Sequence, residues 1–224
     1  MAKGIPALPA ICFFTLLSKL EGTTVPYTLS QLLKVDAQNG VAGAASIDPS
    51  KKYPLFVTWD KHSAQGRKKA GEDDDELYSL RGCIGTFGPS HVLEKEAGNY
   101  AAIAAFNDTR FSPISQRELE SLKCSVTLLD NFEKAKDPLD WTVGKHGIIV
   151  SFSLRKRNYH ATFLPDVMTE QGWTKEEAIS QCMRKAGLHS FDRPEDISDL
   201  EVERYTGEKS SLTYSEFLEY SKKL

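Results

Sequence analysis

The run Leu-Arg-Gly-Cys-Ile-Gly-Thr-Phe at 80–87 constrains the fold of this chain more than any other stretch. Its residue types favour a β-strand, but two glycines and a cysteine interrupt the pattern. Glycine inside a strand usually marks a bulge, or the close approach of a ligand or of another part of the backbone. The run therefore predicts a strand that carries a site.

Strand geometry suggests a chemical role for the cysteine of this run. In a regular strand Arg81 and Cys83 share one face, because side chains alternate, and Gly85 leaves an empty place beside the thiol. The other face would carry Leu80, Ile84 and Thr86. A guanidinium near a thiol favours the nucleophilic thiolate. The alternative is an inert Cys83 packed in a core strand, with Arg81 pointing to solvent.

Composition excludes several classes of protein. The 224 residues are 40% hydrophobic, which allows a substantial core, and the net charge of −3 gives no electrostatic footprint for general binding to nucleic acid or anionic membranes. The longest apolar run, 7–17, is too short to span a bilayer. Four cysteines without CxxC spacing fit a reducing compartment, so we expect a cytoplasmic location, with the nucleus as an alternative.

Periodicity and capping signals predict alternating helices and antiparallel strands. We expect helices at 7–20, 29–35, 90–105, 115–122, 174–186 and 213–224. We expect strands at 53–59, 80–87, 124–129, 159–164 and 200–205, and one that begins after Gly144 or Gly147 and ends at Leu154. This order favours an α+β class built on antiparallel sheet with flanking helices, and 224 residues are enough for one large domain or two small ones. The charged stretch 61–79 is expected to be a mobile insertion.

Further candidates for chemistry lie outside the run. His146 is flanked by glycines at a strand entrance, where it is either a general base or a surface turn residue. Asp108 and Arg110 follow an Ala-rich helix and are expected to form a charge pair. The histidines have no metal-ligand spacing and the chain has no phosphate-binding glycine loop, so we predict neither a metal nor another cofactor.

Six runs together resemble the AMMECR family, named for a human chromosomal region associated with Alport syndrome, midface hypoplasia and elliptocytosis. The Leu-Arg-Gly-Cys-Ile-Gly motif is highly specific to that family, and the resemblance extends from about Pro9 to Leu224. The runs are 53–59, 80–87, 108–111, 143–148, 161–165 and 170–173.

The resemblance implies a single two-lobed α+β domain over 1–224, whose motif face lines a groove between the lobes. No reaction is firmly established for that family, so the resemblance implies none. Genomic association of such proteins with Memo-type proteins and radical-SAM enzymes implies a macromolecule-modification pathway, and the animal relatives imply a protein-interaction role in ubiquitin-ligase regulation. The 61–79 stretch and the long 22–52 segment depart from the family pattern.

Two hypotheses from different classes follow. In the first, a thiol enzyme uses Cys83 as nucleophile, Arg81 as electrostatic partner and His146 as base. Its substrate-binding set would be Gly82, Gly85, Thr86, Asp108 and Arg110. In the second, a non-enzymatic binding or adapter module holds a small molecule, a peptide or a protein partner at the same place. Nucleic acid and membranes are disfavoured as partners of either.

Overall fold

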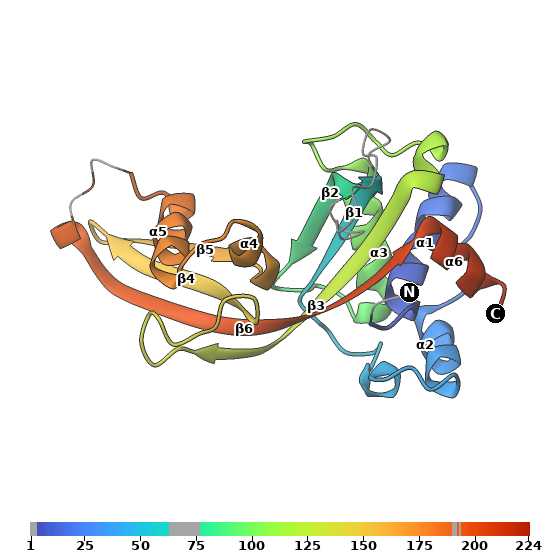
Figure 1. Ribbon diagram of the computed structural model, residues 1–224, viewed down its shortest axis with the longest axis horizontal. Helices are drawn as coiled ribbons and strands as arrows, with labels where there is room; N and C mark the ends of the chain where they lie inside the picture. The colour runs from blue at the N-terminus through green and yellow to red at the C-terminus, as the bar shows by residue number, and fades with distance from the viewer. Residues whose placement is uncertain (1–3, 63–76, 190–191, 193) are drawn as a thin grey trace, which may run out of the picture. The chain divides into compact units, whose positions relative to one another are not determined.

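The computed structural model describes residues 4–62, 77–189, 192 and 194–224, and these divide into two compact units. Unit 1 comprises residues up to Leu128 together with 208–224, and unit 2 comprises 129–207. Six strands form one sheet in the order β2-β1-β3-β6-β4-β5 (Figure 1). The strands β3 (Leu122–Lys134) and β6 (Ile197–Thr213) contribute residues to both units.

Unit 1 is built on strands β1 (Leu55–His62) and β2 (Tyr78–Thr86), which pair antiparallel with each other, while β1 also pairs antiparallel with β3. Helix α3 (Leu93–Phe106) passes behind β1 and β3 in the view of Figure 1. The other elements of this unit are α1 (Ala7–Glu21), α2 (Leu29–Gln38), η1 (Ala44–Ser46), η3 (Gln116–Ser121) and α6 (Tyr214–Ser221).

The core of unit 1 lies between the sheet and helices α1 and α3. Eleven residues of α1 are buried, as its dense apolar sequence predicts, and Gly22 ends the helix with a left-handed φ of 68°. Phe13 of α1 packs edge-on against Trp59 of β1 at 5.1 Å between ring centroids, and the Trp59 indole N–H donates to the carbonyl of Ala101 in α3. These contacts fix which face of β1 looks toward the helices.

Unit 2 has its own smaller core. Strand β4 (His146–Leu154) pairs antiparallel with β5 (Arg157–Phe163) and with β6. Helices α4 (Pro165–Glu170) and α5 (Lys175–Ala186) cover one side of β4 and β5 in Figure 1, and η4 spans Pro194–Asp196. The buried side chains include Trp141, Ile148 and Cys182.

The structure confirms the α+β class on antiparallel sheet with flanking helices. The predicted capping boxes at Thr174 and Thr213 are formed. The helix predicted to start near Ser90 begins instead at Leu93, because the Glu96 carboxylate accepts the backbone N–H groups of Ser90 and His91 ahead of the first turn. Helix α4, which starts at a proline, was not predicted, and β6 is longer than the expected 200–205.

The predicted insertion at 61–79 is narrower than expected. Lys61 and His62 complete β1, and Tyr78 and Ser79 begin β2, with His62 opposite Tyr78. The remainder, 63–76, lies outside the described residues, so its mobility stays a prediction. Within the described part of the chain, no helix has the length and apolar character needed to cross a bilayer.

Candidate functional site

The strand that carries the motif is not regular. Trp59 of β1 pairs with Gly82 and Asp60 pairs with Leu80, which leaves Arg81 as the extra residue of a β-bulge. The alternation predicted for a regular strand is therefore wrong at Arg81. Beyond the bulge the register is regular, with Thr58 opposite Cys83 and Phe56 opposite Gly85.

Cys83 lies on the face of the sheet that points away from α3. Residues directly opposite each other share a face, and successive residues change face. Trp59 and Gly82 face α3, so Thr58 and Cys83 face the other way. We call this side, represented by Phe56, Thr58, Cys83 and Ser125, the outer face.

Three small polar side chains form a row across the outer face. Thr58 is opposite Cys83 in β2 and also opposite Ser125 in β3, so the row crosses three adjacent strands. The Thr58 hydroxyl donates to the Cys83 sulfur at 3.2 Å. Cys83 is partly exposed, whereas the other three cysteines of the chain are buried.

The row ends in a buried hydroxyl. Ser125 is 1% exposed, and its Oγ has no hydrogen-bond partner among the described residues. A buried polar group without a partner is unfavourable, by roughly 1–3 kcal/mol. Because the hydroxyl is covered, a ligand group could bond to it and remove that penalty only after the atoms that cover it move aside.

The backbone of Cys83 is held by an ion pair. Its N–H donates to Asp108 Oδ2 at 2.9 Å, and its carbonyl accepts from Arg110 Nη2 at 3.0 Å. Asp108 and Arg110 also bond to each other, with a shortest distance of 2.7 Å. Strand β2 stands at one end of the strand order, so this pair closes the free sheet edge at Cys83. The predicted charge pair is confirmed, and its hydrogen bonds hold the pKa of Asp108 well below the usual range.

The thiol is not in a setting that favours ionisation. Burial raises the pKa of Cys83 and outweighs the lowering by the Thr58 hydrogen bond and by the Arg110 charge. The expected lowering of the thiol pKa by Arg81 is therefore wrong. The neighbouring carboxylates of Asp60 and Asp108 raise the pKa further.

Arg81 instead forms an ion pair with Glu118. Its Nε lies 2.9 Å from Oε1 and its Nη2 3.3 Å from Oε2, and Nη2 also donates to the Pro113 carbonyl. Both side chains are largely buried, at 11% and 15% exposed. The Arg81 hydrogen bonds lower the pKa of Glu118 to about 2, helped by the backbone of Ser115 and by Lys61. Arg81 thus stabilises the bulge and η3.

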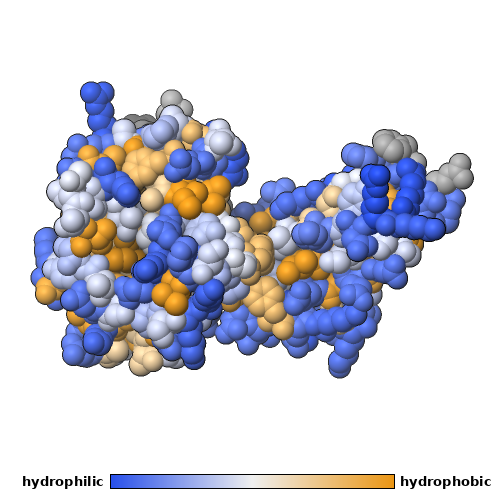
Figure 2. Space-filling view, turned by 180° about the vertical axis from the view of Figure 1, so that it is seen from behind, coloured by the Kyte–Doolittle hydropathy of each residue, from blue (hydrophilic) through white to orange (hydrophobic). Residues whose placement is uncertain are grey.

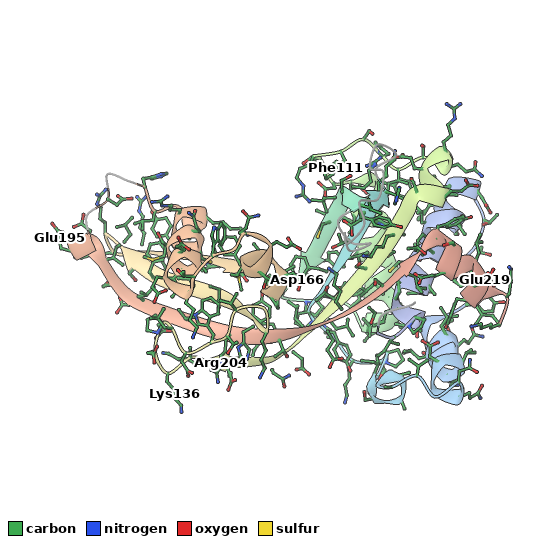
Figure 3. The ribbon with its side chains drawn as sticks, viewed as in Figure 1. Phe111, Lys136, Asp166, Glu195, Arg204 and Glu219 are labelled. Carbon is green, nitrogen blue, oxygen red and sulfur yellow. The ribbon has the colours of Figure 1, made fainter. Side chains whose placement is uncertain are left out.

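An aromatic ring lies beside both guanidinium groups. Phe111, labelled in Figure 3 in the loop that follows α3, has the guanidinium carbon of Arg81 5.9 Å and that of Arg110 5.5 Å from its ring centroid. Cation–π contacts of this kind hold planar charged groups in place. Of the two arginines, Arg110 has the exposed side chain, at 54%.

The two motif glycines serve internal packing. A Cβ on Gly82 would lie 2.2 Å from the carbonyl oxygen of Ala104 in α3. A Cβ on Gly85 would lie 2.3 Å from Phe56 Cγ and 2.3 Å from the Leu55 carbonyl oxygen. The empty place predicted beside the thiol at Gly85 is therefore wrong, since the Phe56 ring occupies it.

Thr86 is the last residue of β2, and its side chain bonds to the backbone that follows the strand. Its hydroxyl oxygen accepts the backbone N–H of Gly88 at 3.0 Å, which is a turn interaction. The hydroxyl hydrogen is not used in this bond. Its predicted role in substrate binding stays a prediction.

His146 belongs to unit 2, whereas Cys83 belongs to unit 1. It is 8% exposed, and its Nδ1 accepts the backbone N–H of Thr142 at 2.9 Å. Burial and the charges of Lys145 and Arg204 lower its pKa, which favours the neutral ring. The residue begins β4 directly after the turn at 143–145, and it is buried there instead of lying on the surface. Its role as a base stays a prediction.

Within the described residues, no group of three or more His, Cys, Asp and Glu side chains is arranged to hold a metal ion. The predictions of no metal and no other cofactor remain predictions. The geometry places Cys83, Asp108 and Arg110 together, and it directs Arg81 to Glu118.

The comparison with protein families decides the assignment. The AMMECR1 family model matches residues 10–210. The chain belongs to the AMMECR1 family. The bulged strand, its glycines and the Asp108–Arg110 pair all lie inside the region that the family model matches.

Relatives extend over most of the chain. An uncharacterised Saccharomyces cerevisiae protein, YOR289W, is 39% identical over 96% of this chain and 88% of its own length. An uncharacterised Arabidopsis thaliana protein, At2g38710, is 41% identical over 76% of this chain and 75% of its own. The crystal structure of the uncharacterised protein PH0010 from Pyrococcus horikoshii is similar with a TM-score of 0.60 and 25% identity, covering 92% of this chain and 87% of that one.

Sequence reasoning missed Thr58 and Ser125. Both lie in predicted strands, and Thr58 also falls in the run 53–59 of the family resemblance, but neither was singled out as a site residue. The available signal was alternation: on β1 and β3 the apolar side chains at 55, 57, 59 and at 122, 124, 126, 128 leave Thr58 and Ser125 on the opposite face. Only the strand register shows that these two residues and Cys83 form one row.

Proposed function

We propose that this protein is a non-enzymatic binding module, and that the row Cys83, Thr58 and Ser125 on the outer face is its ligand contact. The observation that carries the proposal is the buried hydroxyl of Ser125 at the end of the row, which has no hydrogen-bond partner in the part of the chain that the structure describes. A ligand with a hydrogen-bonding group gains by supplying the missing partner. The protonated thiol and the Phe56 ring beside it provide an apolar contact.

The surroundings of the row support a ligand that lies on the face, not one that adds a strand. Strand addition needs a free backbone edge, and at Cys83 both backbone groups are already bonded to Asp108 and Arg110. The exposed Arg110 guanidinium beside that edge favours a ligand with acidic or carbonyl groups. A small molecule or a side chain of a peptide fits this description, and an adapter role in ubiquitin-ligase regulation is compatible with it.

A fragment screen followed by NMR tests the binding proposal. Small amides and carboxylates are added to the ¹⁵N-labelled chain, and backbone amide shifts are recorded. We expect binders that shift the amides of Thr58, Cys83 and Ser125, with affinity reduced about tenfold in Ser125→Ala because one buried hydrogen bond is lost. Thr127→Ala, on the same face of β3, is the matched control. Equal affinity in Ser125→Ala would overturn the proposal.

A thiol enzyme is the second candidate function, with Cys83 as nucleophile. It is favoured by the Thr58 hydrogen bond to sulfur and by the Arg110 charge, both of which lower the thiol pKa. It is disfavoured because burial reverses their effect and because Arg81 is bonded to Glu118. The two candidates predict opposite pH profiles for alkylation of Cys83.

A further inference from the structure

Unit 1 has a cavity that is separate from the outer face. Its volume is about 700 Å³, and it lies along α1 and α3 and the loop before α2. Ligand pockets usually measure roughly 300–1,000 Å³. The cavity is therefore large enough for a small organic molecule.

Small residues of α3 let the two helices approach. A Cβ on Gly98 would lie 3.0 Å from Thr15 Oγ1, and the Cys12 thiol of α1 lies 3.7 Å from the carbonyl oxygen of Ala97. The floor of the cavity between the helices is consequently made by Thr15, Gly98 and Ala102.

The cavity has two different ends. Thr15 of α1 and Gly98 of α3 lie against each other. Lys19 comes one helical turn after Thr15, and Lys95 comes one turn before Gly98. Both lysines therefore lie at the same end of the cavity. Ile11 and Ala102 lie one turn away in the opposite directions and form the other end. The cavity thus has a basic end and an apolar end.

The cavity lining carries two lysines and two glutamates and so has no net formal charge, which means that any preference for an anion depends on where these groups lie. Within the described part of the chain, Lys19 and Lys95 have no carboxylate within ion-pair distance. Glu94 also lines the cavity, but its carboxylate accepts the N–H groups of Leu29 and Ser30 at the start of α2. The Glu96 carboxylate is likewise bonded, to backbone N–H groups of the preceding loop. Neither acid is directed at the lysines.

Two apolar side chains that line the cavity are partly exposed to solvent. Val25 and Ile103 are 38% and 37% exposed, and both line the cavity. Figure 2, drawn from behind the view of Figure 1, shows apolar and strongly polar residues side by side on the surface of unit 1. Exposed apolar groups rimmed by charge commonly mark a binding site.

We infer that this cavity binds a small amphipathic anion, with the anionic group at Lys19 and Lys95 and an apolar chain toward Ile103. The two lysines, which have no carboxylate partner among the described residues, select the charge of the headgroup, and the apolar end gains by covering hydrocarbon. The site is independent of the outer face and of the proposed function.

Octanoate is the probe that tests this inference on the full chain. Titration by calorimetry, with ¹⁵N amide shifts to locate the site, should show octanoate bound along α1 and α3. Octylammonium and 1-octanol, which have the same chain length, should bind at least tenfold more weakly. Added salt should weaken octanoate binding, because the lysines are exposed to solvent.

Variants separate the site from nonspecific adsorption. The double variant Lys19→Gln with Lys95→Gln should weaken octanoate about tenfold, since two solvent-accessible ion pairs are removed. Lys34→Gln, an exposed lysine of α2, is the matched control and should bind as the parent does. Ile103→Ser should also weaken binding while keeping both lysines.

Three results would overturn the inference. The first is no octanoate binding by a folded chain. The second is unchanged affinity in the double lysine variant. The third is binding of an acidic amphipathic peptide without binding of octanoate, which would assign the cavity to a protein partner instead.

Discussion

Gly82 in unit 1 and Gly147 in unit 2 stand beside the two strongest chemical candidates of the sequence, Cys83 and His146. Each glycine lies against packed atoms of its own unit, which are the Ala104 carbonyl for Gly82 and the Tyr205 ring for Gly147, at 2.2 and 2.3 Å from a Cβ. The comparison teaches that glycine beside a reactive residue can mark internal packing. The two regions differ in what a Cβ would meet, which is a backbone carbonyl at Gly82 and a side-chain ring at Gly147.

The neighbours of these glycines differ as well. His146 is buried and its Nδ1 is bonded to backbone, which favours a structural role. Cys83 remains partly exposed, next to a buried hydroxyl that lacks a partner among the described residues. The region around Cys83 is therefore the one that keeps a partly exposed reactive side chain, although burial raises the pKa of its thiol.

The largest expected effect is that of Gly82→Ala. The new methyl group meets a helix carbonyl that cannot move without shifting α3, so we expect a loss of about 4 kcal/mol in the free energy of unfolding. Urea denaturation followed by circular dichroism measures it. Gly88→Ala, where a Cβ meets nothing within 4 Å, is the control and should change stability by less than about 0.5 kcal/mol. A similar small loss in both variants would refute the packing role of Gly82.

Gly147→Ala should cost about 3 kcal/mol, because the methyl group meets the buried Tyr205 ring, which is stacked on Phe132. This loss should be partly relieved when Tyr205 is also shortened. In a double-mutant cycle with Tyr205→Val we expect a favourable coupling of about 1 kcal/mol or more. Additive losses would show that the ring is not the obstacle.

The ion pair of Arg81 with Glu118 in unit 1 and that of Arg204 with Glu133 in unit 2 allow a second comparison between the units. Glu118→Gln leaves the buried Arg81 without its carboxylate, so we expect a loss of about 2 kcal/mol. Glu133→Gln is the matched change on Arg204 of β6, labelled in Figure 3, where the acid is 57% exposed. That change should cost less than about 0.5 kcal/mol. Equal costs, measured by urea denaturation, would contradict the structural role given to Arg81.

Acid should weaken unit 1 through Glu118. Its pKa falls from an ordinary 4.5 to about 2 in the fold. A lowered carboxyl pKa gives stability that is complete above about pH 4.5 and lost as the pH falls toward 2. From this residue alone we expect a loss of about 1.5 kcal/mol between pH 5 and pH 3. Glu118→Gln should remove that part of the pH dependence, and an unchanged slope would contradict the assignment.

Much of the fold could be predicted because its signals are local. The apolar density of α1, the capping boxes at Thr174 and Thr213, and the strand chemistry of 80–86 are all contained in a few neighbouring residues. The Asp108–Arg110 pair is equally local, since a single residue separates its partners. The α+β class follows from the order of such elements.

The site geometry could not be predicted in the same way, because it depends on register and on distant partners. The bulge at Arg81 is a property of pairing with β1, and Glu118, which bonds Arg81, lies 37 residues away in sequence. The row of Cys83 with Thr58 and Ser125 needs the pairing of three strands. The rise in the pKa of the Cys83 thiol comes from burial, and burial exists only in the folded chain.

The pH dependence of Cys83 alkylation by iodoacetamide tests the central claim most directly. The other three cysteines are buried, so labelling of the native chain should disappear in Cys83→Ser. Because burial raises the thiol pKa, we predict that the rate is low at neutral pH and rises with a midpoint above that of free cysteine, about 8.5. A midpoint below that of free cysteine would show an activated thiolate, which would contradict the binding-module account and favour the enzyme.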